Sequence, residues 1–121
     1  MLVVKVWCLP NSGENMLNGI HQEIVKAVAG IPELGVKSEA DMLTLFPTDM
    51  MEYGLGTEIL IEVLCDERPW DSQDGNEMRN KLARNIGTTV QTFFPKAKIY
   101  CIPVIINRMI GYWSSEEENV G

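Results

Sequence analysis

The chain has 121 residues, of which 45% are hydrophobic, so it is long enough for one domain with a buried core and too short for two such domains. It carries 17 acidic and 10 basic side chains, which gives a formal net charge of −7 at pH 7. A chain this acidic repels the phosphates of nucleic acids and of anionic membranes, so we expect neither as a partner.

The apolar start of the chain is too short for a signal peptide or a membrane span. Met1–Val4 is interrupted by Lys5 and followed by Pro10, whereas a spanning helix needs about 20 apolar residues. We therefore expect a cytoplasmic protein.

The three cysteines, Cys8, Cys65 and Cys101, give no sign of a metal or redox site. They lie inside apolar runs and lack the CxxC spacing of zinc sites and redox motifs. The sequence therefore predicts buried thiols, with no metal and no cofactor.

The first strand is predicted over Val3–Leu9, which is rich in β-branched residues and alternates in character. One face of this strand has small apolar side chains that suit packing against a helix. The other face carries Lys5 and Trp7 beside Val3.

A helix and a short strand complete the first half of the chain. Asn11 and Glu14 have the spacing of a reciprocal helix cap, and apolar residues then recur at helical intervals as far as Gly30. His21 falls within this helix, and we interpret it as a partly buried or surface residue without a catalytic role. Asp41–Phe46 then predicts the second strand.

The second half repeats the pattern of strand, helix and strand. Thr57–Cys65 alternates between a core face and a mixed face that carries glutamate and leucine. A helix follows from a cap at Asp74 to the stop at Pro95, with Thr89 among the apolar positions. Lys98–Ile106 is the last strand, and a proline within it implies an edge strand or a bulge.

The order of elements predicts an α+β fold of two tandem β-α-β units. Four strands form one mixed sheet, and the two helices cover one face of it. This single domain spans residues 1–113, and residues 114–121 form an acidic tail that we expect to be disordered. The other sheet face is too apolar to remain in water and too charged for a core, so we expect it to pack against other copies of the chain.

Four stretches of the sequence resemble the tautomerase superfamily, which includes 4-oxalocrotonate tautomerase and macrophage migration inhibitory factor. They are the strand that begins at residue 1, the loop Glu52–Gly56 (EYGLG) before the second β-α-β unit, and the segments Ile61–Arg68 and Ile102–Arg108. The two segments look most like those of a small bacterial branch with the same fold. The resemblance extends from Met1 to about Trp113 and implies a homotrimer with a pocket near each amino terminus, at a subunit boundary.

The resemblance implies a proton-transfer catalyst at the amino terminus. Active members use an amino-terminal proline, exposed by removal of methionine, as a base that moves a proton between carbons of a keto acid. Here the second residue is Leu2, which is too bulky for efficient methionine removal. The mature chain is therefore expected to keep Met1, whose α-amine becomes the candidate base, with a reference pKa of about 7.7–8.

Two arginines are candidate ligands for a substrate carboxylate. Arg68 stands where family members carry a carboxylate-binding arginine, although it could instead be a solvated residue paired with Asp66 or Glu67. Arg108 interrupts an apolar run, and its alternatives are the pocket and an inter-subunit ion pair.

Three further residues complete the predicted substrate-binding set. Leu2 adjoins the amine, and Tyr53 either lines the pocket or anchors its own loop. Lys5 lies close to the amino terminus, where it contacts substrate or forms an ion pair with Glu58 or Glu62.

The sequence leaves three functions open. The first is a keto-enol tautomerase or isomerase that acts on small carboxylates. The second is a non-catalytic trimer that binds a small anion or another protein through the same cleft. The third is a ferredoxin-like regulatory module, which has the same order of elements in a different strand arrangement.

Overall fold

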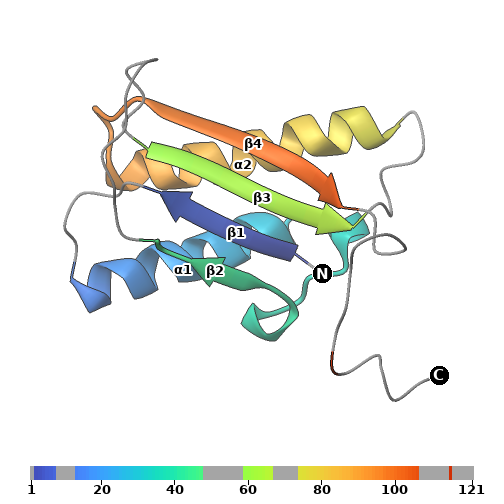
Figure 1. Cartoon of the computed structure of the whole chain (residues 1–121), viewed down its shortest axis with the longest axis horizontal. Coiled ribbons are helices and arrows are strands. Elements are labelled where there is room, and N and C mark those ends of the chain that lie inside the picture. Colours follow the sequence, from blue (N-terminus) through green and yellow to red (C-terminus); the bar gives the residue numbers. More distant parts are fainter. Residues whose placement is uncertain (1, 8–12, 48–58, 67–73, 107–114, 116–121) are drawn as a thin grey trace.

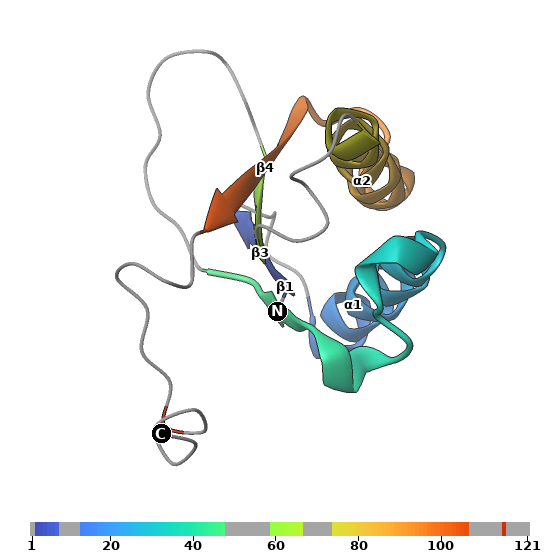
Figure 2. The same cartoon turned by 90° about the vertical axis from the view of Figure 1, so that its right-hand side faces the viewer.

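The structure is a computed structural model that describes residues 2–7, 13–47, 59–66, 74–106 and 115. Its elements in chain order are β1 (Leu2–Trp7), α1 (Glu14–Ala29), the 3₁₀ turns Pro32–Leu34 and Glu39–Asp41, β2 (Leu43–Leu45), β3 (Ile59–Asp66), α2 (Asp74–Phe93) and β4 (Ile99–Ile106). Both helices lie on one face of a four-stranded sheet (Figures 1 and 2). The predicted two-layer α+β fold of tandem β-α-β units is confirmed.

The strands are ordered β2-β1-β3-β4 across the sheet. The pairs β1–β2 and β3–β4 are parallel, and the antiparallel pair β1–β3 joins them. Each β-α-β unit thus contributes two strands that are direct neighbours. A ferredoxin-like fold instead splits each unit by inserting another strand, so this strand order excludes that alternative.

The core lies between the sheet and the helices, and the predicted periodicities account for it. Its fully buried members include Val4, Val6, Ile20, Ile24, Val28, Ile31, Ile59, Ile61, Val63, Leu82, Ile86 and Val90. In α2 the buried position is Val90 in place of the expected Thr89, because the four-residue step from Leu82 continues through Ile86 to Val90.

The structure corrects two expected element boundaries, the N-cap of α1 and the start of β2. Helix α1 has Gly13 as its N-cap, with no side-chain cap, and Asn11 lies outside the described residues. Strand β2 begins at Leu43, because the Asp41 carboxylate accepts the backbone N–H groups of Lys37 at 2.9 Å and Ser38 at 3.3 Å. These bonds hold a 3₁₀ turn where the sequence suggested the start of a strand.

Strand β4 lies at the edge of the sheet, as its proline predicted. The Ile59 N–H donates to the Lys98 carbonyl at 3.1 Å, which directs alternate residues of β4 toward β3 and places the nitrogen of Pro103 on the outer side. A residue without an N–H is tolerated there. The Glu52–Gly56 loop and, apart from residue 115, the tail over residues 114–121 lie outside the described residues.

Within the described ranges, neither helix combines the length and apolarity that crossing a bilayer requires.

Candidate functional site

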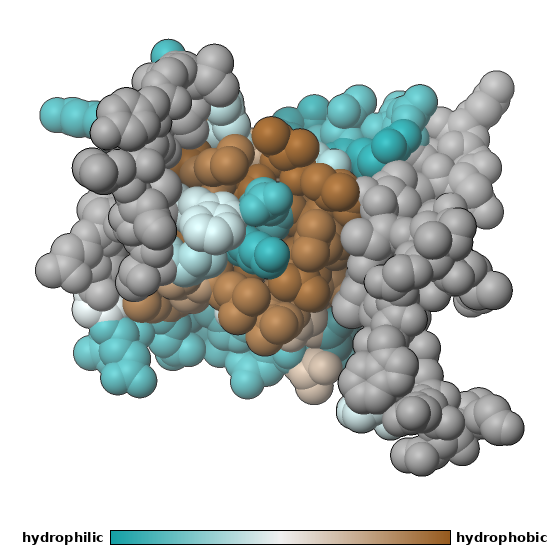
Figure 3. Space-filling view, in the orientation of Figure 1, coloured by the Kyte–Doolittle hydropathy of each residue, from teal (hydrophilic) through white to brown (hydrophobic). Residues whose placement is uncertain are grey.

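The sheet face that turns away from the helices, called the open face below, carries side chains in register across the strands. Its three rows are Leu43-Val3-Leu64-Val104, Leu45-Lys5-Glu62-Ile102 and Trp7-Leu60-Tyr100. Figure 3 views this face directly and shows a continuous apolar surface around a small polar centre.

The open face exposes several large apolar side chains. Leu43 and Ile102 are about half exposed, at 51% and 50%, and Leu45, Tyr100 and Val104 are exposed as well. Contiguous apolar patches beyond a few hundred Å² are uncommon on monomers and mark interaction surfaces. This face therefore has the character of an interface.

The polar centre of the open face consists of Lys5 and Glu62, which lie directly opposite each other on β1 and β3. The Trp7 indole Nε1 donates a 2.6 Å hydrogen bond to Glu62 Oε1. Among the described residues, Lys5 makes no ion pair, so its expected partnership with Glu62 is not formed within the chain. The other expected partner, Glu58, lies outside the described residues.

The strand ends that lead to the predicted pocket residues lie together at one end of the sheet. Leu2 pairs with Cys65 at the end of β3, and the next residue, Asp66, pairs with Ile106 at the end of β4. Arg68 follows Asp66 by two residues, and Arg108 follows Ile106 by two.

Leu2 is only 4% exposed and belongs to the hydrophobic core. Its side chain therefore anchors the start of β1. Met1, Tyr53, Arg68 and Arg108 themselves lie outside the described residues.

The loop that carries Tyr53 joins the sheet at the opposite end. It leaves after β2, which runs parallel to β1, and returns at Ile59, beyond the pairing of Trp7 with Leu60. The attachment points of this loop are thus separated from Leu2 by the length of β1.

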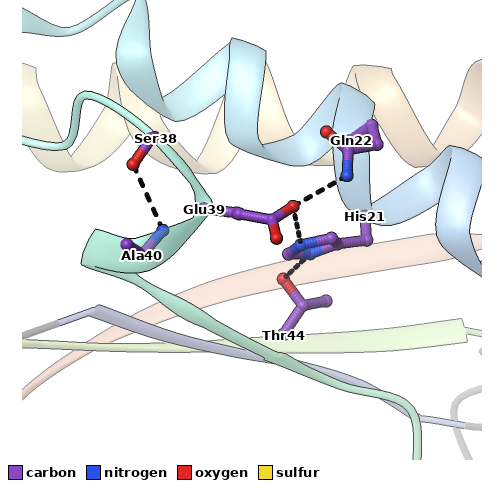
Figure 4. A network of polar contacts seen from close by, with 6 residues as sticks. All are labelled: His21, Gln22, Ser38, Glu39, Ala40 and Thr44. Carbon is purple, nitrogen blue, oxygen red and sulfur yellow. Dashed lines mark hydrogen bonds and ion pairs between the residues drawn. The ribbon is translucent and has the colours of Figure 1, made fainter.

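A second cluster of polar side chains connects α1 to β2, the strand at the edge of the sheet opposite β4 (Figure 4). His21 Nδ1 lies 2.8 Å from Thr44 Oγ1, and His21 Nε2 lies 3.5 Å from Glu39 Oε2. Gln22 Nε2 donates to the same Glu39 oxygen at 2.8 Å. The His21 side chain is 21% exposed, so the prediction of a partly buried histidine is confirmed. Its contacts connect α1 to β2 and to the 3₁₀ turn that contains Glu39.

A groove of about 550 Å³ lies between α2 and β4. It is lined by Asn76, Arg79, Asn80, Ala83, Cys101, Ile102 and Pro103. Arg79 donates a hydrogen bond to Asn76 Oδ1. The Nε atom of Arg79 is buried and has no hydrogen-bond partner within the described part of the chain. Burial, with a smaller contribution from Cys65, raises the pKa of Cys101 to about 12, so this thiol stays neutral and is a poor nucleophile.

The sequence did not single out Arg79, because an arginine on a helix surface carries no distinguishing pattern. Within the described ranges, no three His, Cys, Asp or Glu side chains cluster as a metal site would require.

No protein-family model and no curated protein matches this chain. Solved structures do match it. Macrophage migration inhibitory factor from Toxoplasma gondii is 14% identical, with a TM-score of 0.64 over 93% of this chain and 96% of that one. Native fused 4-OT is 10% identical, with a TM-score of 0.67 over 97% and 98% of the two chains. A further fused 4-OT, described as an asymmetric trimer, is 12% identical, with a TM-score of 0.65 over 96% and 98%. The chain therefore has the fold of the tautomerase superfamily.

Proposed function

We propose that this protein is a keto-enol tautomerase or a related isomerase of small carboxylates, and that it works as a homotrimer. The observation that carries the proposal is the meeting of three chain segments at one end of the sheet, where Leu2, Asp66 and Ile106 lie on neighbouring strands. Met1, Arg68 and Arg108 are each within two residues of those points. In this proposal a base and two guanidinium groups act together at that end of the sheet.

In this proposal the Met1 α-amine is the acid-base group. Burial of Leu2 in the core holds the start of β1 in place. A pocket that excludes water would lower the pKa of the amine and leave it unprotonated near neutral pH. The neutral amine then accepts a proton from the substrate and returns it to a different atom.

The two arginines would bind the substrate carboxylate. A guanidinium group offers paired N–H donors that match the two oxygens of a carboxylate, which fixes the orientation of the substrate as well as its affinity. Arg68 follows the end of β3 by two residues and Arg108 follows the end of β4 by two, and these strands are parallel neighbours. In this proposal both arginines bind the same carboxylate.

The pocket is proposed to lie at a subunit boundary. The loop with Tyr53 joins the sheet at the end far from Leu2. In this proposal the loop serves the pocket of an adjacent copy. The apolar open face supplies a surface for such copies. The match to a fused 4-OT described as an asymmetric trimer supports the same assembly. A cytoplasmic location remains a prediction from the sequence.

Ketonisation of phenylenolpyruvate tests the catalytic proposal. Mass spectrometry first establishes the mature amino terminus, and the purified protein is expected to ketonise the enol faster than buffer does. A Met1→Pro chain, made by placing proline after the initiator methionine, is expected to be faster still. This variant keeps Leu2 in the core, which Leu2→Pro would not.

The arginines are tested in the same assay. Arg68→Ala and Arg108→Ala are each expected to raise KM at least tenfold, whereas Arg84→Ala, on the exposed surface of α2, is expected to change nothing. Ketonisation no faster than buffer, for both the natural chain and the Met1→Pro chain, would overturn the proposal.

A second candidate is a non-catalytic trimer that binds a small anion at the same end of the sheet. The observation that favours it is Leu2 in the position where active tautomerases carry proline. Labelling of the α-amine with cyanate over a range of pH separates the two functions. An amine that titrates near its reference pKa of about 8 supports the binding protein, and a clearly lower pKa supports the enzyme.

A further inference from the structure

We propose that Lys5 and Glu62 form ion pairs between copies of this chain, and that these pairs determine how the open faces align in the assembly. The inference rests on the homotrimer of the proposed function and identifies the contact that orients it.

The position of the two charges provides the first argument. Lys5 and Glu62 occupy the middle of the second row, with Leu45 on one side and Ile102 on the other. The first and third rows flank the two charges on either side, and Figure 3 shows apolar surface next to this small polar centre. Any partner that covers the apolar surface must therefore also remove these two charges from water, which is costly unless each charge is paired.

Unused bonding capacity provides the second argument. Glu62 Oε1 accepts the indole N–H of Trp7, and within the described ranges no cation approaches this carboxylate. Lys5 faces the open side with its ammonium unpaired among the same residues. The carboxylate retains lone pairs and the ammonium retains three donors, so a protein partner can satisfy both.

A second copy of the chain is the occupant that satisfies both charges at once. The open face holds one positive and one negative group at its centre, so it is complementary to itself. In a cyclic trimer each Lys5 meets the Glu62 of the next copy, and three such contacts close a ring with no net charge. A partner with a purely acidic, purely basic or purely apolar surface would leave one of the two charges unpaired.

Alignment is the expected consequence. Apolar surfaces can slide over one another at small cost, whereas a buried ion pair loses its partner when the register shifts. Lys5 and Glu62 thus act as positioning residues for the interface that creates the proposed pocket.

Charge reversal tests this inference, with assembly followed by sedimentation velocity over a range of protein concentrations. Lys5→Glu and Glu62→Lys are each expected to raise the concentration for half-assembly at least tenfold. Lys81→Glu makes the same charge change on the exposed surface of α2 and is expected to have no effect. Circular dichroism establishes that each variant is folded. If a reversal prevents folding, Lys5→Gln and Glu62→Gln replace the reversals, with the same expected direction.

Mixing the two reversal variants distinguishes pairs between copies from pairs within one copy. A mixed cyclic trimer has attraction at two of its three contacts, so an equimolar mixture is expected to assemble at lower concentration than either variant alone. Native mass spectrometry with one variant labelled with ¹⁵N detects the mixed species.

The possible failures point to different conclusions. Failure of the mixture to assemble better than its components would overturn pairing between copies. A trimer unaffected by either reversal would overturn the inference and leave the proposed assembly intact. A natural chain that stays monomeric at all concentrations would overturn both, and the ketonisation assay would then judge the catalytic proposal separately.

Discussion

His21 on α1 and Thr44 on β2 are joined by a 2.8 Å contact between Nδ1 and Oγ1. Thr44 points toward the helices, while its neighbours Leu43 and Leu45 point to the open face. The contact therefore fastens the shortest strand of the sheet and, with it, one border of the proposed interface.

Removal of this contact is expected to destabilise the fold modestly. His21→Ala and Thr44→Val should each lower the free energy of unfolding by about 1 kcal/mol, because a partly buried hydrogen bond contributes on that order. Urea denaturation of both single variants and the double variant measures the coupling between the two residues. Fully additive effects would show that the contact contributes nothing, and Gln22→Ala, on the exposed side of the same group, serves as the control.

The two faces of the sheet are expected to respond differently to the same substitution. Ile61→Ala removes a fully buried side chain on the helix side and should lower the free energy of unfolding by about 2–5 kcal/mol. Ile102→Ala, on the open face, should change the stability of the isolated chain little and weaken self-association. Denaturation at low protein concentration and sedimentation at high concentration measure the two effects. Equal losses of stability would contradict the assignment of the faces.

Gln91 closes the C-terminal end of α2. Its Nε2 donates to the carbonyls of Phe94 at 3.3 Å, Pro95 at 3.2 Å and Ala97 at 3.0 Å. Gln91→Met keeps the length of the side chain and removes the donor, so it should lower the free energy of unfolding by about 1–2 kcal/mol. Thr92→Val is the control, because Thr92 donates to the Thr88 carbonyl on an exposed surface. A loss no greater than that of the control would count against this capping role.

Cys101 should make the fold sensitive to alkaline pH. Burial raises its pKa from 9.0 to about 12 in the folded chain, so between these values the folded state holds a proton that the unfolded state releases. Its contribution to stability is complete below pH 9 and falls as pH rises toward 12, by about 1.4 kcal/mol per pH unit. Cys101→Ala should have a correspondingly flatter profile in urea denaturation from pH 8 to 11. Parallel profiles for the two chains would contradict the raised pKa of Cys101.

The core and the order of elements could be predicted because each depends on patterns local to one segment. A strand buried on one side must alternate, as Ile59 and Ile61 do, and a helix buried on one side must repeat every three or four residues, as Leu82 and Ile86 do. The edge position of Pro103 follows for the same kind of reason, because a missing N–H cannot serve a central strand.

Element boundaries were less predictable because they depend on competing polar contacts. Asp41 has a neighbourhood that suits a strand, yet its carboxylate binds two backbone N–H groups and forms a turn. These two hydrogen bonds also lower the pKa of Asp41, which favours the charged form that accepts them.

At the candidate site, too, some features could be predicted from the sequence and others depend on the tertiary structure. By itself, the sequence determined the two β-α-β units, the mixed character of one sheet face and the residue types suited to holding a carboxylate, because composition and periodicity are properties of single segments. Only the tertiary structure decided that β1 is antiparallel to β3 and β3 parallel to β4, which brings Leu2, Asp66 and Ile106 to one end of the sheet. It also decided that Lys5 and Glu62 stand side by side without an ion pair among the described residues. Strand direction and register arise from pairing between segments far apart in the chain, so no single segment contains them.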